Sequence, residues 1–243
     1  MGPIEQFQQE RLERIEMNGK NRKLVQAADD FMRESTIPKY SYNFSWMGRP
    51  IIQYPQDMIA MQEIIWEIQP DLVIETGIAH GGSLIFYASI LELIGKGEVL
   101  GIDIDIREHN RREIESHPMF KRISMIEGSS ISGDIVAKAG NAAREKQTVL
   151  IVLDSNHTHE HVLKELELYS GFVTKGSYLV VFDTIIEDMP PNSFSDRPWE
   201  KGNNPKTAVR EFLKSHDEFV VDKNIDHKLL ISVAPDGYLK RVK

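Results

Sequence analysis

Residues 70–83 read PDLVIETGIAHGGS: a short apolar run ends in an acid and passes into a loop that holds three glycines. Glycine lets the backbone turn tightly and lets a ligand approach it closely. The next helix is expected to begin at about Gly82 or Ser83, where its first N–H groups are free to bind a ligand. The stretch predicts a buried strand, a ligand-binding turn and a helix, with an ordinary strand-to-helix turn as the alternative.

The loop differs from the dinucleotide-binding pattern G-x-G-x-x-G. An acid, Glu75, precedes the first glycine, and the later glycines are spaced more widely. A carboxylate in that position suits a cationic ligand better than a pyrophosphate. We therefore expect five residues in and beside this loop to bind the ligand: Glu75, Thr76, Gly77, Gly81 and Ser83.

The chain after this loop repeats the pattern of apolar runs separated by segments of helical length. Strands that are apolar on both faces and alternate with helices are typical of a parallel sheet covered on both sides. After a helix expected around residues 208–213, two more apolar runs follow at residues 219–221 and 229–233. The pattern predicts an α/β, Rossmann-like fold with a mostly parallel seven-stranded sheet, an antiparallel last strand and helices on both faces. The first five runs are residues 72–74, 99–102, 123–126, 149–153 and 178–182.

Two segments precede the first strand. Apolar residues from Met58 to Ile68 fall at helical spacing, which predicts a helix with Asp57 as its N-cap. Residues 40–50 read YSYNFSWMGRP and end in turn residues, which predicts an aromatic loop. Such a loop either lines a substrate pocket or covers the core.

The N-terminal part is charged and only imperfectly periodic, so helix is plausible there. We expect a helical arm over residues 1–38 that packs on the domain or on another subunit. One catalytic domain is expected over residues 39–243.

The composition excludes several classes of protein. The 243 residues carry a formal net charge of −8 and no cluster of Lys and Arg among aromatic residues, so nucleic acid is not an expected partner. There is no cysteine, which excludes disulfides, thiolate metal sites and cysteine nucleophiles. No run of about 18 apolar residues and no signal peptide are found. We expect a cytoplasmic protein without membrane contact, and self-association through the arm is one option.

Polar residues follow the apolar runs at the sheet edge where such folds bind ligands. Asp103 ends the second run, and nucleotide-binding folds place a carboxylate about 20 residues after the loop to bind ribose hydroxyls. Asp105 is the next nearest acid and alternatively caps the following helix. Ser129, after the third run, is expected to face an adenine ring or to cap a helix.

Asp154 and Asp183 end the fourth and fifth runs, so their carboxylates are expected to converge. Unpaired, they would repel each other, whereas a hard divalent cation such as Mg²⁺ accepts both. His157 follows Asp154 by three residues and is the predicted general base, because histidine accepts a proton near neutral pH. His157, His159 and His161 also allow a transition-metal site, although a helix starting here would spread them over different faces.

Together these residues resemble class I S-adenosylmethionine-dependent methyltransferases, specifically the cephalosporin hydroxylase and rhamnosyl O-methyltransferase family. The resemblance is carried mainly by residues 57–83, with support from residues 101–105, residues 153–155 and the ending GYLKR at residues 237–241. It covers roughly residues 40–243 and leaves the arm unmatched. The cofactor that it implies carries a sulfonium and an ammonium group, the kind of charge that Glu75 suits.

The resemblance also implies a metal and a set of residue roles. Family members are expected to carry an acidic pair at the end of the fifth strand, but Phe182 stands first here, so Thr184 becomes a candidate replacement ligand. The site is similar to catechol O-methyltransferase, in which a lysine base stands where His157 stands here. The implied cofactor-binding residues are Glu75, Gly77, Ser83, Asp103 and Asp154, and the implied Mg²⁺ ligands are Asp154 and Asp183.

The expected function is S-adenosylmethionine- and Mg²⁺-dependent methyl transfer to a hydroxyl of a small molecule, a sugar or a natural product. Residues 190–205 and residues 40–46 are expected to form a polar and aromatic lid over this acceptor. One alternative is an oxidoreductase or hydroxylase of a natural-product pathway, which the family's name suggests. A second is a non-catalytic cofactor-binding protein, for which Phe182 is the hint.

Overall fold

The computed structural model describes residues 2–243. Its centre is a seven-stranded sheet in the order β5-β4-β3-β6-β7-β9-β8. Within these residues, β9 alone runs antiparallel to its neighbours, which confirms the predicted mixed sheet. The strands are β3 (Leu72–Thr76), β4 (Glu98–Asp103), β5 (Ile123–Glu127), β6 (Val149–Leu153), β7 (Tyr178–Val181), β8 (Phe219–Val221) and β9 (Tyr238–Arg241).

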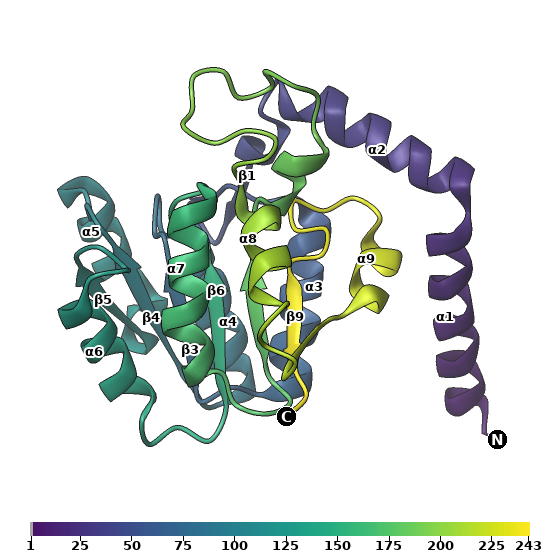
Figure 1. The fold of residues 1–243 in the computed structure, drawn as a ribbon. Coiled ribbons are helices and arrows are strands. Elements are labelled where there is room, and N and C mark those ends of the chain that lie inside the picture. Colours follow the sequence, from purple (N-terminus) through teal and green to yellow (C-terminus); the bar gives the residue numbers. More distant parts are fainter. Residues whose placement is uncertain (1) are drawn as a thin grey trace.

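Helices cover both faces of the sheet, as the apolar runs predicted, and each face has its own buried cluster. In Figure 1, α6, α7 and α8 lie in front of the sheet, and α3 and α4 lie behind it. A strand residue therefore meets helices on either side, which is why the runs carry no polar face. The helices are α3 (Pro55–Ile68), α4 (Gly82–Ile94), α5 (Glu108–Glu115), α6 (Gly133–Ala143), α7 (His159–Tyr169), α8 (Pro205–Phe212) and α9 (Lys223–Leu229).

The predicted N-cap of α3 is wrong. Tyr54 caps the helix, and Asp57 lies inside its first turn with no exposed surface. The Asp57 carboxylate accepts hydrogen bonds from the Ser232 hydroxyl at 2.6 Å, the Val233 N–H at 2.9 Å and the Tyr238 hydroxyl at 2.8 Å. It therefore fastens the C-terminal segment to α3 instead of capping its own helix.

The last strand also lies elsewhere than predicted. Residues 229–233 end α9 and continue as irregular chain, while β9 forms from Tyr238 to Arg241. Val233, at the end of the run, is 8% exposed and belongs to the cluster behind the sheet, and the half-buried Leu229 and Ile231 pack against that cluster. Asp57 takes up the Val233 N–H, a group that a strand would need for its ladder.

The aromatic stretch forms a small hairpin where a loop was predicted. A 3-10 turn η1 (Tyr40–Asn43) leads into β1 (Phe44–Trp46), which pairs with β2 (Arg49–Ile51). Trp46 covers α4: its Nε1 donates to the Ser89 hydroxyl at 3.0 Å, and its ring meets Phe86 edge-on at 5.0 Å. The aromatic residues thus cover the core, and the chain that leaves β2 turns toward the carboxyl ends of the strands.

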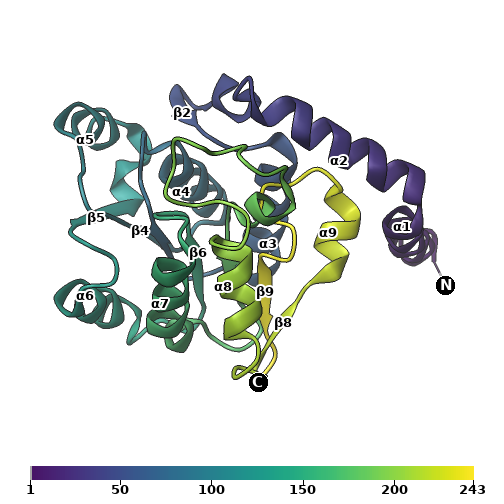
Figure 2. The same ribbon diagram turned by 45° about the horizontal axis from the view of Figure 1, so that its top comes forward.

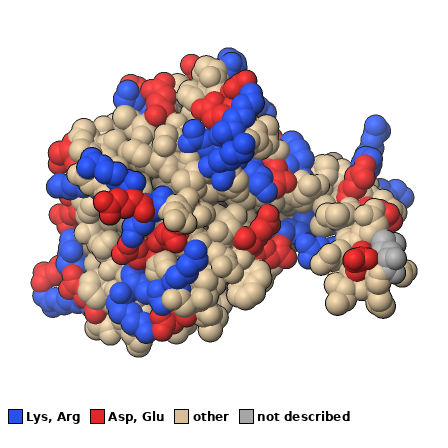
Figure 3. Space-filling view, turned by 90° about the horizontal axis from the view of Figure 1, so that it is seen from below, with Lys and Arg blue, Asp and Glu red and all other residues tan. Residues whose placement is uncertain are grey.

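The N-terminal arm consists of α1 (Pro3–Lys20) and α2 (Arg22–Thr36). Figure 2 shows α2 crossing the top of the molecule and α1 standing beside α9. The arm stands out from the body in Figure 3, where Lys and Arg side chains are interspersed with Asp and Glu. In α1 only Ile15 is buried, whereas α2 buries Ala28, Met32 and Ser35. Across residues 2–243, every helix is too short or too polar to cross a membrane.

Candidate active site

The site lies where the order of the strands reverses, between β3 and the strands on either side of it. The loop after β3 touches the end of β6 directly, since a Cβ on Gly77 would lie 2.1 Å from the Asp154 carbonyl oxygen. Gly77 also has a φ of +93°, which favours glycine. The predicted ligand-binding turn is therefore packed against the predicted metal site.

Two hollows open at this edge of the sheet, one on each side of the glycine loop, and they share Gly77, Asp103 and Ser155. An extended ligand could therefore lie across both. The first hollow is lined by Pro50, Ile51, Ile52, Gln53, Gly77, Ile78, Ala79, His80, Ser83, Asp103, Asp154 and Ser155. The second hollow is lined by Gly77, Ile102, Asp103, Ile104, Ser129, Ser130, Ser155, Asn156 and His161.

Asp103 stands at the junction of the two hollows. Its Oδ2 accepts hydrogen bonds from the N–H groups of Ile78 at 2.7 Å and Ala79 at 3.3 Å, and its Oδ1 accepts from the Asp105 N–H at 3.1 Å. These bonds hold the glycine loop to the end of β4. Ser129 lines the second hollow, on the side where an adenine ring was expected.

Glu75 lies behind the first hollow. It is 1% exposed and accepts from the Ser83 hydroxyl at 2.6 Å and the Tyr87 hydroxyl at 3.1 Å. Burial raises the pKa of Glu75 to about 8, against the effect of these two hydrogen bonds. Thr76 is buried beside it, and Gly81 caps α4 with a φ of +79°. Ser83 therefore lines the hollow, and the Glu75 carboxyl lies behind Ser83.

The carboxylates predicted to converge do so. Asp154, His157 and Asp183 each offer one ligand atom, and within residues 2–243 these atoms lie within 4.8 Å of one another. His157 Nε2 is 3.1 Å from Asp183 Oδ2. Burial and the charge of Asp183 raise the pKa of Asp154 well above its usual range. A divalent cation at this point would remove that repulsion.

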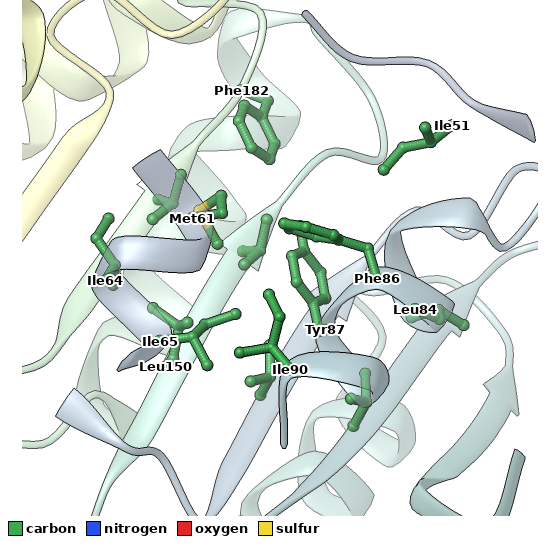
Figure 4. Packing of buried hydrophobic residues seen from close by; sticks show 14 of the residues in the cluster. Ile51, Met61, Ile64, Ile65, Leu84, Phe86, Tyr87, Ile90, Leu150 and Phe182 are labelled. Atoms are coloured by element: carbon green, nitrogen blue, oxygen red, sulfur yellow. The ribbon is translucent and has the colours of Figure 1, made fainter. Parts of the chain in front are cut away.

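Phe182 and Thr184 flank Asp183 but face other surroundings. Phe182 is 2% exposed and belongs to the apolar cluster with Met61 and Ile51, as Figure 4 shows. Asp183 has a φ of +57°, so the chain turns sharply between these residues. The Thr184 hydroxyl donates to the Pro235 carbonyl at 2.7 Å. Its role as a metal ligand stays a prediction.

The other two histidines have their own partners. His159 Nδ1 is 2.8 Å from the Thr207 hydroxyl, and its Nε2 is 3.4 Å from a Glu211 carboxylate oxygen. His161 Nε2 is 3.2 Å from the Ser130 hydroxyl, at the second hollow. A three-histidine metal site is therefore not formed within the described part of the chain.

A family model described as rhamnosyl O-methyltransferase/CmcI matches residues 38–242. The chain belongs to this family. It is 32% identical to the rhamnosyl O-methyltransferases of Mycobacterium leprae, over 81% of this chain and 82% of the relative, and of Mycobacterium tuberculosis, over 81% and 78%. A solved structure of CmcI with Mg and SAM has the same fold, with a TM-score of 0.57 and 18% identity over 83% of this chain and 78% of that one. The chain is thus an O-methyltransferase by family.

In this O-methyltransferase, a loop of residues 189–204 leads from the 3-10 turn η4 (Thr184–Asp188) to α8. It lies at the same end of the sheet as the β1 hairpin in Figure 1. Glu187 fastens its far end by accepting from the Gly202 N–H at 2.8 Å and the Asn204 side-chain amide at 2.6 Å. The Trp199 ring meets the His157 ring edge-on at 4.7 Å. The loop therefore reaches His157 of the candidate metal-binding group, which consists of Asp154, His157 and Asp183.

Two side chains near the site were missed from the sequence. Trp199 is the aromatic residue that reaches His157, and an aromatic in an otherwise polar stretch was a signal that could have found it. Gln53 is buried against the first hollow. Nothing in its sequence context marks it, because the contact depends on how the β1–β2 hairpin packs on α4.

Proposed function

We propose that this chain transfers the methyl group of S-adenosylmethionine, in the presence of Mg²⁺, to a hydroxyl of a small molecule, with sugar hydroxyls as the leading class. The observation that carries this proposal is the position of Asp154. Asp154 lines the hollow beside the glycine loop, and its carboxylate belongs to the group formed with His157 and Asp183. A cofactor in that hollow and a metal on that group would be neighbours.

The two hollows suit the three parts of the cofactor. The second hollow, with Ile102, Ile104 and Ser129, offers apolar and small polar groups to an adenine ring. Asp103 at the junction would bind the ribose hydroxyls. The first hollow then takes the aminoacyl group, with Ser83 on its wall and the Glu75 carboxylate behind it.

The donor set also suits a divalent cation. Asp154 and Asp183 offer the oxygen ligands that Mg²⁺ prefers, and substrate oxygens and waters complete such a shell. When bound, Mg²⁺ lowers the pKa of a hydroxyl that coordinates it. In this arrangement His157 lies beside the metal ligands, with Nε2 3.1 Å from Asp183 Oδ2, and is the general base that removes the hydroxyl proton. Trp199, against the His157 ring, would exclude water from this side.

The rhamnosyl O-methyltransferases among the relatives support a sugar acceptor, since their name states one. The Trp199 ring supports it from the geometry, because an aromatic ring beside His157 could pack against a sugar ring. The metal-binding group has one histidine and two carboxylates. A non-haem iron oxygenase needs two histidines and one carboxylate, so this donor set favours methyl transfer over hydroxylation.

The test is a panel of acceptors offered with S-adenosylmethionine that carries a deuterated methyl group. Rhamnosylated compounds, other glycosides and phenols are analysed by mass spectrometry for the labelled methyl group. We expect at least one glycoside to gain it, and only when the cofactor is present. Product that forms without S-adenosylmethionine and requires iron and 2-oxoglutarate would establish the hydroxylase instead. Cofactor binding without any product across the panel would favour the non-catalytic alternative.

A further inference from the structure

Gln53 carries a buried acceptor that no other group satisfies. The residue is 7% exposed, and within residues 2–243 its Oε1 has no hydrogen-bond partner. Buried polar atoms are nearly always paired, so an orphan at a ligand pocket points to a donor on the ligand. Gln53 lines the first hollow together with Ser83 and Asp154.

The backbone around Gln53 is held at both ends. Upstream, the Arg49 guanidinium donates to the His80 carbonyl at 2.6 and 3.0 Å. A Cβ on Gly82 would lie 2.1 Å from the Pro50 carbonyl oxygen, so β2 lies directly on the start of α4. Downstream, the buried Tyr54 hydroxyl is 2.8 Å from the Ser35 hydroxyl. The segment cannot simply swing out to hydrate the amide.

The acidic and hydroxyl side chains already described at this hollow each have a hydrogen-bond partner or another proposed role. Both Glu75 oxygens accept hydrogen bonds from hydroxyl groups, and the Ser83 hydroxyl donates its proton to Glu75. Asp103 holds the glycine loop and the Asp105 N–H. Asp154 belongs to the metal-binding group. Gln53 therefore lines the hollow and carries a neutral acceptor that has no hydrogen-bond partner within residues 2–243 and no other proposed role.

We propose that Gln53 Oε1 accepts an N–H of the ammonium group of bound S-adenosylmethionine. This inference rests on the proposed function, which places the aminoacyl part of the cofactor in the first hollow. An ammonium group has three N–H donors and needs several acceptors when it leaves water. Gln53 would contact the ammonium group from the wall of the hollow that follows the β1–β2 hairpin. Glu75 would act on the same ammonium group through the Ser83 hydroxyl. Gln53 is thus a cofactor-binding residue supplied from outside the central sheet.

The test compares two ligands that differ in this group. S-adenosylhomocysteine carries the ammonium, and 5′-methylthioadenosine lacks the whole aminoacyl end. We expect Gln53→Met to raise the Kd of S-adenosylhomocysteine at least about tenfold, as for a hydrogen bond to a charged group, and to leave that of 5′-methylthioadenosine within about twofold. Gln53→Glu keeps an acceptor and should retain affinity for S-adenosylhomocysteine.

Gln56→Met is the matched control. Gln56 also has a buried Oε1 without a partner, but it does not line the first hollow. The control should leave both Kd values unchanged, and calorimetry with thermal melting shows whether each variant is folded. An equal loss of both ligands in Gln53→Met, or no loss of either, would overturn the inference.

Two further outcomes separate this inference from the proposed function. An unchanged Kd for S-adenosylhomocysteine with a raised KM for the acceptor would assign Gln53 to the acceptor hydroxyl and overturn the inference alone. Failure of the unmodified protein to bind S-adenosylhomocysteine would overturn the proposed function as well.

Discussion

Glu75 is a buried acid whose charge depends on what lies in front of it. With the hollow free of cations, burial raises its pKa to about 8, so the carboxyl holds its proton at pH 7. The ammonium group of a bound cofactor favours the carboxylate and lowers this pKa. Cofactor binding is therefore linked to loss of a proton.

We predict that the protein releases up to one proton per bound cofactor at pH 7, and that affinity rises with pH up to about pH 8. Calorimetry in buffers of different ionisation enthalpy measures this number directly. Glu75→Gln cannot release the proton, while the ligand's own titration contributes equally to both proteins. Equal proton release by the two proteins would show that Glu75 does not respond to the cofactor.

Asp154 is the residue shared by the first hollow and the metal-binding group. We predict that Asp154→Ala lowers kcat at least about 100-fold, because the chemistry that a metal supplies to the hydroxyl is worth several kcal/mol. The Kd of S-adenosylhomocysteine should change little, since most of the cofactor's contacts lie along the glycine loop and at Asp103. Asp217→Ala, at an exposed carboxylate, is the control. Retained turnover in Asp154→Ala would exclude the proposed metal role.

Site residues that directly follow a strand could be predicted from the sequence, because the end of a strand determines where the next side chain lies. Asp154 and Asp183 converge for that reason. Gln53 and Trp199 could not be predicted, since their positions depend on the packing of a hairpin and of an irregular loop. Asp57 was predicted as a cap, and its partners, 175 or more positions away in the chain, left no local signal.

Among the elements, the link between α3 and the C-terminal segment depends on Asp57. Burial raises the pKa of this carboxyl from 3.8 to about 6, despite its three hydrogen bonds. The folded state therefore binds the proton more tightly than the unfolded state between these pH values. Stability from this group is present at low pH and falls as the pH rises through 4 to 6.

We predict that the free energy of unfolding of the unmodified protein, relative to Asp57→Asn, falls by about 2 kcal/mol from pH 4 to pH 7. Urea unfolding at several pH values measures it, with Asp217→Asn as the matched exposed carboxylate. A constant difference across this range would mean that the Asp57 pKa is not raised in the folded state.

The elements themselves were predicted where the chain is periodic. The strands from β3 to β7 match the apolar runs; β3, β4, β6 and β7 are buried on both faces, whereas β5, at the edge of the sheet, is only partly buried. Near the C-terminus the same rule failed: residues 229–233 form an apolar run, but only its end is buried, and Asp57 binds the Val233 N–H that a strand would use. The aromatic residues 40–50 formed a hairpin because Trp46 and Phe86 pack together, a contact between distant parts of the chain.

For the whole molecule, the two arm helices differ in how they join the domain. Met32 of α2 is 3% exposed within the core cluster, and Ser35 meets the Tyr54 hydroxyl. In α1 only Ile15 is buried, and the helix packs beside α9. The family match begins at residue 38 and therefore does not include α2, although α2 contributes Met32 to the core.

We predict that removing residues 1–20 changes the Tm by only a few degrees, whereas removing residues 1–38 lowers it by roughly 5–15 °C, because the loss of a buried Met costs about 2–5 kcal/mol. Thermal melting of the two truncated chains beside the full chain checks this. Equal Tm values for the two truncations would show that α2 does not stabilise the domain.

The proposed site transfers a methyl group at a metal held by Asp154 and Asp183, beside a cofactor in the first hollow. The most direct test follows transfer of a deuterated methyl group from S-adenosylmethionine to the acceptor identified from the panel, before chelation, after exhaustive chelation and after Mg²⁺ is added back. We predict that chelation abolishes transfer and that Mg²⁺ restores it. Transfer that continues unchanged in the chelated protein would contradict the account.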